Sequence, residues 1–112
     1  MDIAIVQQGD ATILALSGRM DATTVGEFEQ AWRERIEAGE TRIVVDLAGI
    51  EYISSAGLRG ILSLLKMCKS KGGRLAFCSM GTMVAEVFKI SGFTAMLSIH
   101  ENRDGAVAFV GA

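Results

Sequence analysis

A short apolar run near the middle of the chain limits the possible folds more than any other feature. The segment from Thr41 to Leu47 contains the unbroken run Ile43-Val44-Val45. β-Branched residues favour strands, and a strand that lacks polar alternation is buried on both of its faces. Such a strand lies in the middle of a sheet that has helices on either side. The run therefore predicts a layered α/β fold.

Strand and helix patterns alternate along the rest of the chain. Apolar residues at every second position predict an N-terminal hairpin between Ile3 and Leu16, with its turn at Gln8-Gly9-Asp10. After a loop at 17–21, the spacing predicts a helix from Val25 to Ile36, a strand at 41–47 and a helix that begins at Ala56 and is stopped by Gly72-Gly73. A strand at 74–78, a helix that ends near Gly92, a strand at 96–99 and a helix at 102–110 follow.

This order predicts an α/β fold in a single domain over residues 1–112. We expect a mostly parallel sheet with an N-terminal antiparallel hairpin and about four helices. Thr24 and Glu27 have the spacing of a capping box at the start of the first helix. The predicted buried face of the second helix consists of Leu58, Ile61, Leu62, Leu65 and Cys68.

Net charge and the lengths of uncharged runs argue against two classes of partner. Eleven Lys and Arg residues against thirteen Asp and Glu residues give a net charge of -2, so there is no basic excess to bind nucleic acid. No uncharged run approaches the roughly 20 apolar residues that a membrane-spanning helix needs. The N-terminus lacks the basic segment and apolar run of a secretory signal. We therefore expect a cytoplasmic protein that binds neither nucleic acid nor membrane.

The motifs of common enzymes are absent, and no cofactor or metal site is expected. Cys68 and Cys78 fall in a helix pattern and a strand pattern, which favours reduced core residues, and His100 is the only histidine. Ser63 and Lys66 match an SxxK motif, but they lie inside the second helix without the partner motifs of that chemistry. An enzyme that uses Ser63 and Lys66, or His100, is a remote alternative.

The informative stretch is segment 46–60, DLAGIEYISSAGLRG, which joins the buried strand to an amphipathic helix. Ser54 and Ser55 stand where that helix begins. One interpretation is structural, because a serine hydroxyl at the N-cap accepts a bond from a free amide of the first turn. The other is functional, because the same amides and the positive end of the helix dipole favour a phosphate. A phosphoserine there adds about -1.5 to -2 charges to the surface without breaking the helix.

Segment 46–60 resembles the signature of STAS-domain anti-sigma factor antagonists, in which a serine at the start of the second helix is phosphorylated. Ser55 occupies that position, and Ser54 is the rival acceptor. The resemblance extends to 16–21, LSGRMD, to the Lys71-Gly72-Gly73 turn and to 90–93, ISGF. It implies a single STAS domain that acts by partner switching. The unphosphorylated form binds an anti-sigma factor serine kinase and releases the sigma factor, phosphorylation of Ser55 ends the binding, and a serine phosphatase resets the cycle.

The resemblance also implies a set of partner-binding residues, namely Asp21, Asp46, Ser54, Gly57, Leu58 and Arg59. Two departures from the family pattern matter. Many members carry Asp before the phosphorylated serine and Ser or Thr after it, whereas this chain has Ser54 and Ala56. Arg59 replaces a common glycine, and its cation can pair with the phosphate or with an acidic partner. Structural roles stay open for Asp21 as a helix cap, for Asp46 at a strand end and for Arg59 as a surface charge.

Two further alternatives keep the fold and change the function. In the first, the same phosphorylation switch regulates a client other than a sigma factor, in secretion, motility or signalling. In the second, the domain binds a nucleotide or a lipid as part of a sensor or transport complex. The second alternative has no phosphate-binding loop in the sequence to support it. On every interpretation except the remote one, the chain is a binding module and not an enzyme.

Overall fold

The computed structural model describes residues 1–112 and contains one five-stranded sheet in the order β1-β2-β3-β4-β5. β1 pairs antiparallel with β2, and each later strand pairs parallel with the strand before it. This confirms the α/β class, the N-terminal hairpin and the mostly parallel sheet. The elements are β1 (Asp2–Gln8), β2 (Ala11–Met20), α1 (Val25–Glu37), β3 (Arg42–Ile53), α2 (Ser55–Ser70), β4 (Arg74–Cys78), α3 (Thr82–Ile90), η1 (Phe93–Ala95), β5 (Ile99–His100) and α4 (Arg103–Gly111).

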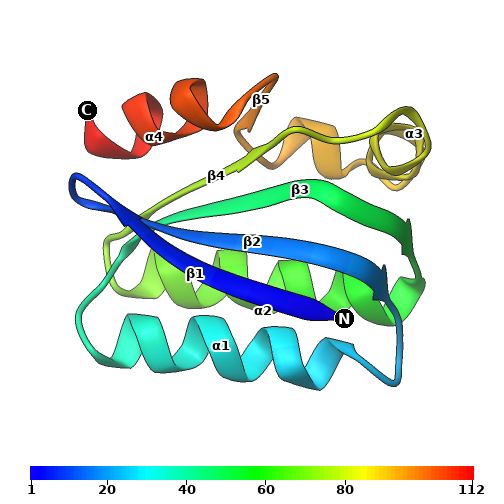
Figure 1. Ribbon diagram of the computed structural model, residues 1–112, viewed down its shortest axis with the longest axis horizontal. Helices are drawn as coiled ribbons and strands as arrows, with labels where there is room; N and C mark the ends of the chain where they lie inside the picture. The colour runs from blue at the N-terminus through cyan, green and yellow to red at the C-terminus, as the bar shows by residue number, and fades with distance from the viewer.

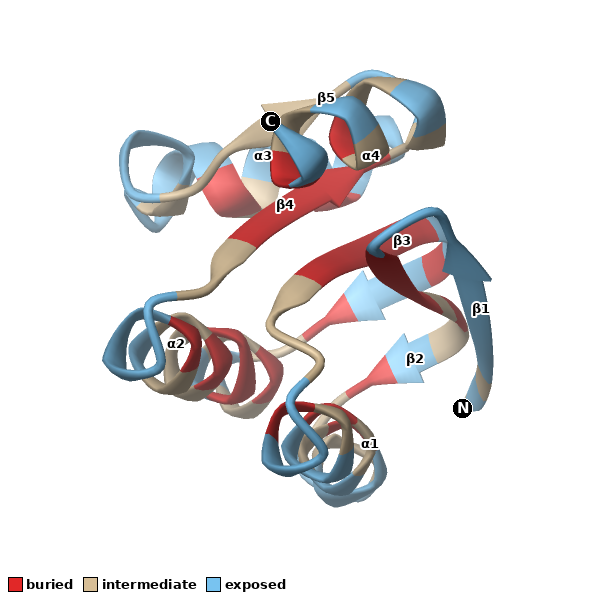
Figure 2. Ribbon diagram, turned by 90° about the vertical axis from the view of Figure 1, so that its left-hand side faces the viewer, coloured by how far each residue is buried: buried red, intermediate tan, exposed pale blue.

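The helices form layers on both sides of the sheet (Figure 1). α1 and α2 run side by side below it, and α3 and α4 lie above it. The central strands are buried from both sides, as Figure 2 shows for β3 and β4. Ile43 and Val45 belong to the larger core cluster, whereas Val44 lies in a smaller cluster that includes Ala106 and Val110 of α4. The expectation of two-sided burial at 43–45 is confirmed.

β3 is longer than the sequence pattern predicts. The strand does not stop at Leu47 but continues to Ile53, and β2 likewise runs to Met20 through the segment expected to be a loop. Two register shifts, after Ala15 and after Gly18, each place an extra residue on β3. A Cβ at Gly49 would lie 2.6 Å from the Cβ of Ser17, so only glycine fits at the first bulge.

Three smaller predictions are wrong in detail. The capping box at α1 does not form, because the Thr24 hydroxyl donates to the carbonyl oxygen of Arg19 at 2.8 Å and caps no helix amide. The last strand is Ile99–His100 and not 96–99, because the chain at 96–98 forms an irregular turn after η1. On α2 the fully buried large side chains include Leu64, whereas Leu58, Leu62 and Leu65 are half-buried.

None of the helices has the length and apolar character that a membrane-spanning helix requires.

Candidate functional site

The N-terminus of α2 is hydrogen-bonded to the end of β2. The amide of Ser54 donates to the carbonyl oxygen of Met20 at 2.9 Å, so the strand end and the helix start are joined directly. Gly57 permits this approach, because a Cβ there would lie 2.9 Å from the Met20 oxygen and 2.8 Å from Cγ1 of Ile53. Gly57 is buried, so it is placed to hold its neighbours in position and not to contact a partner directly.

The two serines at this junction have different environments. Ser54 is the N-cap of α2, with an extended backbone, and its Oγ accepts a bond from the Gly57 amide at 3.3 Å. Ser55 is the first residue of the helix, its side chain is exposed, and its hydroxyl makes no hydrogen bond within the chain. The structural interpretation of the serine pair therefore applies to Ser54. The free hydroxyl required by the functional interpretation belongs to Ser55.

The electrostatic setting of Ser55 favours a negative charge. The first turn of α2 contains no acidic residue, so no carboxylate of the helix itself offsets the positive end of the helix dipole. Arg59 lies four residues along the helix, on the same face as Ser55, and its exposed side chain forms no ion pair within the chain. Leu58 is half-buried against the main core cluster. This turn therefore offers a hydroxyl and a free cation to solvent.

Asp21 follows Met20 and lies beside the same junction. Its Oδ1 accepts bonds from the hydroxyl of Thr23 at 2.7 Å and from the amide of Thr23 at 3.0 Å. These bonds, with a smaller contribution from the cation of Arg19, lower the pKa of the Asp21 carboxyl. Thr24, not Asp21, is the N-cap of α1. Asp21 is thus an ionised, partly exposed group that also fixes the turn before the helix.

Asp46 is placed differently from the prediction. Its side chain is 9% exposed and pairs with two nitrogens of Arg103 in α4, at 3.0 Å and 2.9 Å. Its other oxygen accepts a bond from the amide of Ala48 at 3.0 Å. A carboxylate that is covered and paired in this way has no free oxygen to offer a partner. Direct partner contact by Asp46 is therefore not supported, and its contacts point to a structural role.

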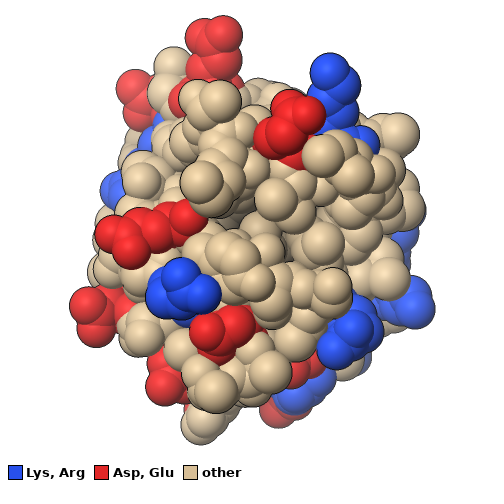
Figure 3. Space-filling model, turned by 90° about the vertical axis from the view of Figure 1, so that its right-hand side faces the viewer, with Lys and Arg blue, Asp and Glu red and all other residues tan.

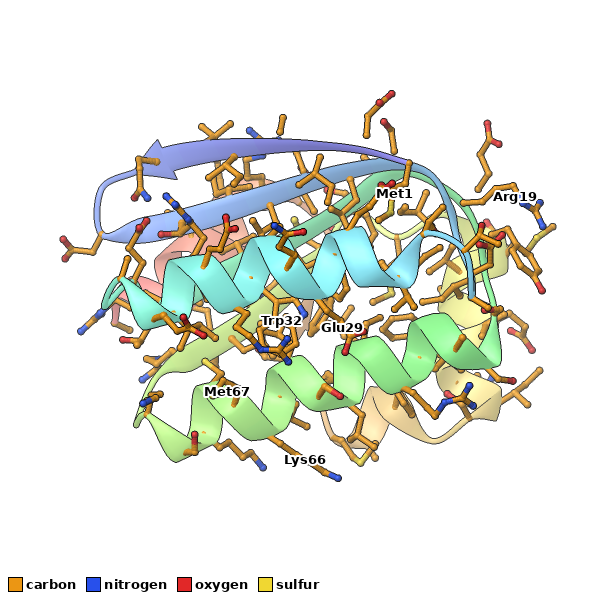
Figure 4. The ribbon with its side chains drawn as sticks, turned by 90° about the horizontal axis from the view of Figure 1, so that it is seen from below. Met1, Arg19, Glu29, Trp32, Lys66 and Met67 are labelled. Atoms are coloured by element: carbon orange, nitrogen blue, oxygen red, sulfur yellow. The ribbon has the colours of Figure 1, made fainter.

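Arg19 and Tyr52 form a second pair in this region, which no sequence pattern indicated. The two residues are register partners on β2 and β3, and the guanidinium carbon of Arg19 lies 4.2 Å from the centre of the Tyr52 ring. Arg19 also lies 3.9 Å from Asp21. Figure 4 places Arg19 at the end of the molecule where α2 begins. Only a correct strand register would have revealed this contact, because the two residues are far apart in the chain.

Figure 3 looks onto this end of the molecule. Uncharged atoms occupy the centre of the face, and acidic and basic side chains lie around it. Charged side chains around an uncharged centre are compatible with the polar rim of a protein–protein interface. We name the switch face as the exposed surface formed by Arg19, Asp21, Tyr52, Ser55 and Arg59.

The residues of the remote enzyme alternative are engaged elsewhere. The Ser63 hydroxyl donates to the carbonyl oxygen of Arg59 at 3.1 Å, along the helix. Oγ of Ser98 and Nε2 of His100 lie 2.9 Å apart, and the His100 ring packs against Phe109. Cys68 and Cys78 are buried free thiols whose pKa values are raised by burial. The Ser63 hydroxyl therefore has no base beside it, and the imidazole of His100 contacts Ser98 and not Ser63.

A mostly parallel sheet edged by an antiparallel hairpin, with a serine-headed second helix at its carboxyl end, defines a known class of domain. The sequence matches the STAS domain family over residues 2–106, and the chain belongs to that family. A relative from Bordetella bronchiseptica, BtrV, bears the name of an anti-sigma factor antagonist and is 35% identical over 96 residues, which cover 86% of this chain and 83% of the relative. The resemblance drawn from segment 46–60 is thereby confirmed at the level of the family.

Solved structures agree on the fold. A crystal structure of a Thermotoga maritima protein, also named for anti-sigma factor antagonism, has a TM-score of 0.92 at 22% identity and covers 98% of this chain and 95% of its own. The Bacillus protein SpoIIAA, whose structure is solved in a phosphorylated form, has a TM-score of 0.75 at 17% identity, with coverage of 97% and 99%. At these identities the two likenesses concern the fold.

Proposed function

We propose that this chain is an anti-sigma factor antagonist of the cytoplasm that works by partner switching. Its unphosphorylated switch face binds an anti-sigma factor that is also a serine kinase, and the bound sigma factor is released. The kinase then phosphorylates Ser55, which ends the binding, and a serine phosphatase restores the hydroxyl. The domain is the substrate and binding module in this cycle and supplies no catalytic residue.

The observation that carries the proposal is the free hydroxyl of Ser55 at the head of α2. A kinase needs an exposed hydroxyl, and Ser55 is exposed and makes no hydrogen bond in the fold. Because Ser54 already caps the helix, modification of Ser55 removes no structural bond. The helix dipole and Arg59 favour the added charge. Two related proteins support the assignment, since BtrV is named as an antagonist and SpoIIAA has a phosphorylated form.

The size of the switch follows from the charge that it adds. Burying an unpaired charge in an interface costs about 2–5 kcal/mol, and each 1.4 kcal/mol is tenfold in affinity. Phosphorylation at the centre of the switch face therefore weakens binding on the order of 30-fold to 5,000-fold. One group of this kind is enough to separate two partners at cellular concentrations.

The test combines mass spectrometry with binding. The protein is incubated with ATP and its cognate serine kinase, and the added phosphoryl group is located by peptide mapping. We expect it on Ser55 in the wild type and in Ser54→Ala, and we expect none in Ser55→Ala. Modification at Ser54 would move the site and keep the mechanism, whereas modification at neither serine would refute the proposal.

Affinity for the kinase is then measured by calorimetry. We expect Ser55→Ala to bind as tightly as the unmodified protein and Ser55→Asp to bind far more weakly. Ser70→Asp is the matched control, because it places the same charge on an exposed serine at the other end of α2. Equal losses for Ser55→Asp and Ser70→Asp would mean that net charge, and not the switch face, governs binding. Whether binding to the kinase releases a sigma factor is measured separately, because that release distinguishes a sigma factor client from a secretion or motility protein.

A further inference from the structure

A second feature lies at the other end of α2 from Ser55. A cavity of about 340 Å³ opens between the last turns of α2, the start of β4, the segment 96–98 and Phe109 of α4. Lys69, which lines it, is fourteen helix positions from Ser55, or about 21 Å along the axis. This volume is at the small end of the range for ligand pockets, roughly 300–1,000 Å³. The cavity is thus separate from the switch face.

The cavity exists because the sheet is incomplete at this edge. β5 pairs only with the end of β4, through bonds from the Phe77 amide to the Ser98 oxygen and from the Ser79 amide to the His100 oxygen. In the register that joins Phe77 to Ile99, Leu75 would pair with Leu97. The chain at 96–98 is not part of the strand, and the backbone of Leu75 on this edge is left without a strand partner. A gap therefore remains beside Leu75, where a longer β5 would extend the pairing with β4.

The walls combine apolar and cationic groups. Leu65, Leu75 and Leu97 contribute to an apolar lining, and Lys69 and Arg74 add two positive charges. Neither cation forms an ion pair within the chain, whose three ion pairs involve other residues. No acidic side chain lines the cavity. The site therefore has an excess of positive charge beside an apolar surface.

Arg74 is held rigidly at the wall of the cavity. Its Nε is buried without a hydrogen-bond partner, as are Nε1 of Trp32 and Nε of Arg35 elsewhere in the chain. Its guanidinium carbon lies 4.5 Å from the centre of the Phe109 ring, and this stacking holds the side chain in place at the cavity wall. Cys68, another lining residue, carries a neutral thiol, because burial raises its pKa. Nothing in the wall opposes an anion.

We propose that this cavity binds an amphipathic anion, namely a single short alkyl or acyl chain that ends in a carboxylate or a phosphate. The chain occupies the apolar part between Leu65, Leu75 and Leu97, and the head group pairs with Arg74 and Lys69. The guanidinium fork matches either oxyanion in a bidentate arrangement. The proposal does not rest on phosphorylation of Ser55, and either can fail without the other.

The test is a titration of the isotope-labelled full chain followed by NMR. Hexanoate, octanoate and octyl phosphate serve as the charged probes and octanol as the uncharged one. We expect saturable shifts of the Leu75 and Leu97 amides, with roughly fourfold tighter binding for each added methylene until the cavity is full. Octanol is expected to bind at least tenfold more weakly than its charged counterparts. Comparison of octanoate with octyl phosphate identifies the preferred head group, and binding of either supports the proposal.

Two variants with matched controls test the named cations. Arg74→Gln is compared with Arg33→Gln, because Arg33 also stacks on an aromatic ring, at 4.8 Å from Trp32, but lies outside this cavity. Lys69→Gln is compared with Lys66→Gln, whose side chain points away from the sheet in Figure 4. We expect at least tenfold weaker binding in Arg74→Gln and in Lys69→Gln and no change in the controls.

The exposed Lys69 variant keeps the test valid if Arg74→Gln does not fold. The absence of saturable shifts in the wild type at millimolar probe would overturn the proposal. So would equal affinity in the cavity variants and their controls, or shifts confined to the head of α2.

Discussion

Replacing each of the two neighbouring serines at the start of α2 by alanine is expected to have a different effect on stability. Ser54→Ala removes the bond from the Gly57 amide to the cap oxygen, and such a loss costs about 0.5–2 kcal/mol. The 3.3 Å length of this bond and the half-buried position of Ser54, which lets water replace the hydroxyl, place the loss near the lower half of that range. Ser55→Ala removes an exposed hydroxyl that bonds nothing in the fold, so its free energy of unfolding stays within about 0.5 kcal/mol of the wild type.

Charge at the second serine acts in the other direction. Ser55→Asp adds a negative group to a first turn that has none, and the helix dipole stabilises it by about 0.3–1 kcal/mol. Urea denaturation and thermal denaturation, both followed by circular dichroism, measure the stability of all three variants. For a domain of this size we expect Ser54→Ala to lower the Tm by roughly 2–5 °C. If Ser55→Ala destabilises the protein as much as Ser54→Ala, then Ser55 is a structural residue and the assignment of the free hydroxyl is refuted.

Three further predictions follow from buried or paired groups. Arg103→Met leaves the covered carboxylate of Asp46 without its partner and lowers the free energy of unfolding by about 1–3 kcal/mol. The double variant with Asp46→Asn is expected to recover part of this loss, and urea titration measures both variants. Cys68 and Cys78 react with a thiol reagent at pH 8 only after denaturation, because both are buried and have raised pKa values; rapid labelling of the native protein would contradict their placement. The pKa of Asp21, measured by NMR titration, is expected to lie below its ordinary value of 3.8. The stabilising effect of its carboxylate is therefore present above pH 3.8 and is lost as the pH falls through the lowered pKa. A titration midpoint above 3.8 would contradict its bonds to Thr23.

The sequence predicted the layers of the fold because local patterns determine them. The alternation in the hairpin, the buried run at 43–45 and the stripe on α1 each reflect which face of one element meets the core. The lengths of β2 and β3 depend instead on pairing between residues distant in the chain. The bulge at Gly49 interrupts the strand pattern, so the residues after it resemble a loop until their partners on β2 are known.

In the candidate site too, features set by local sequence were predictable and features set by distant residues were not. Ser55 and Arg59 were identified correctly as exposed residues of the first turn, because capping and helical periodicity are local. A partner-binding role and a structural role were both open for Asp46, and its contact with Arg103, which is 57 positions away in the chain, favours the structural one. No spacing rule connects those two residues. The failed capping box has a similar cause, since the Thr24 hydroxyl is taken by the end of β2.

The neutral cap at Ser54 explains how this chain can depart from its family and still carry the proposed switch. Many members have Asp immediately before the phosphorylated serine, and an Asp at that position caps the helix while adding a negative charge beside the phosphate. Ser54 supplies the cap without the charge. The first turn of α2 then contains no acidic residue, and Arg59 is free to pair. Because like charges repel strongly at such short range, the phosphorylated state is stabilised more here than behind an acidic cap.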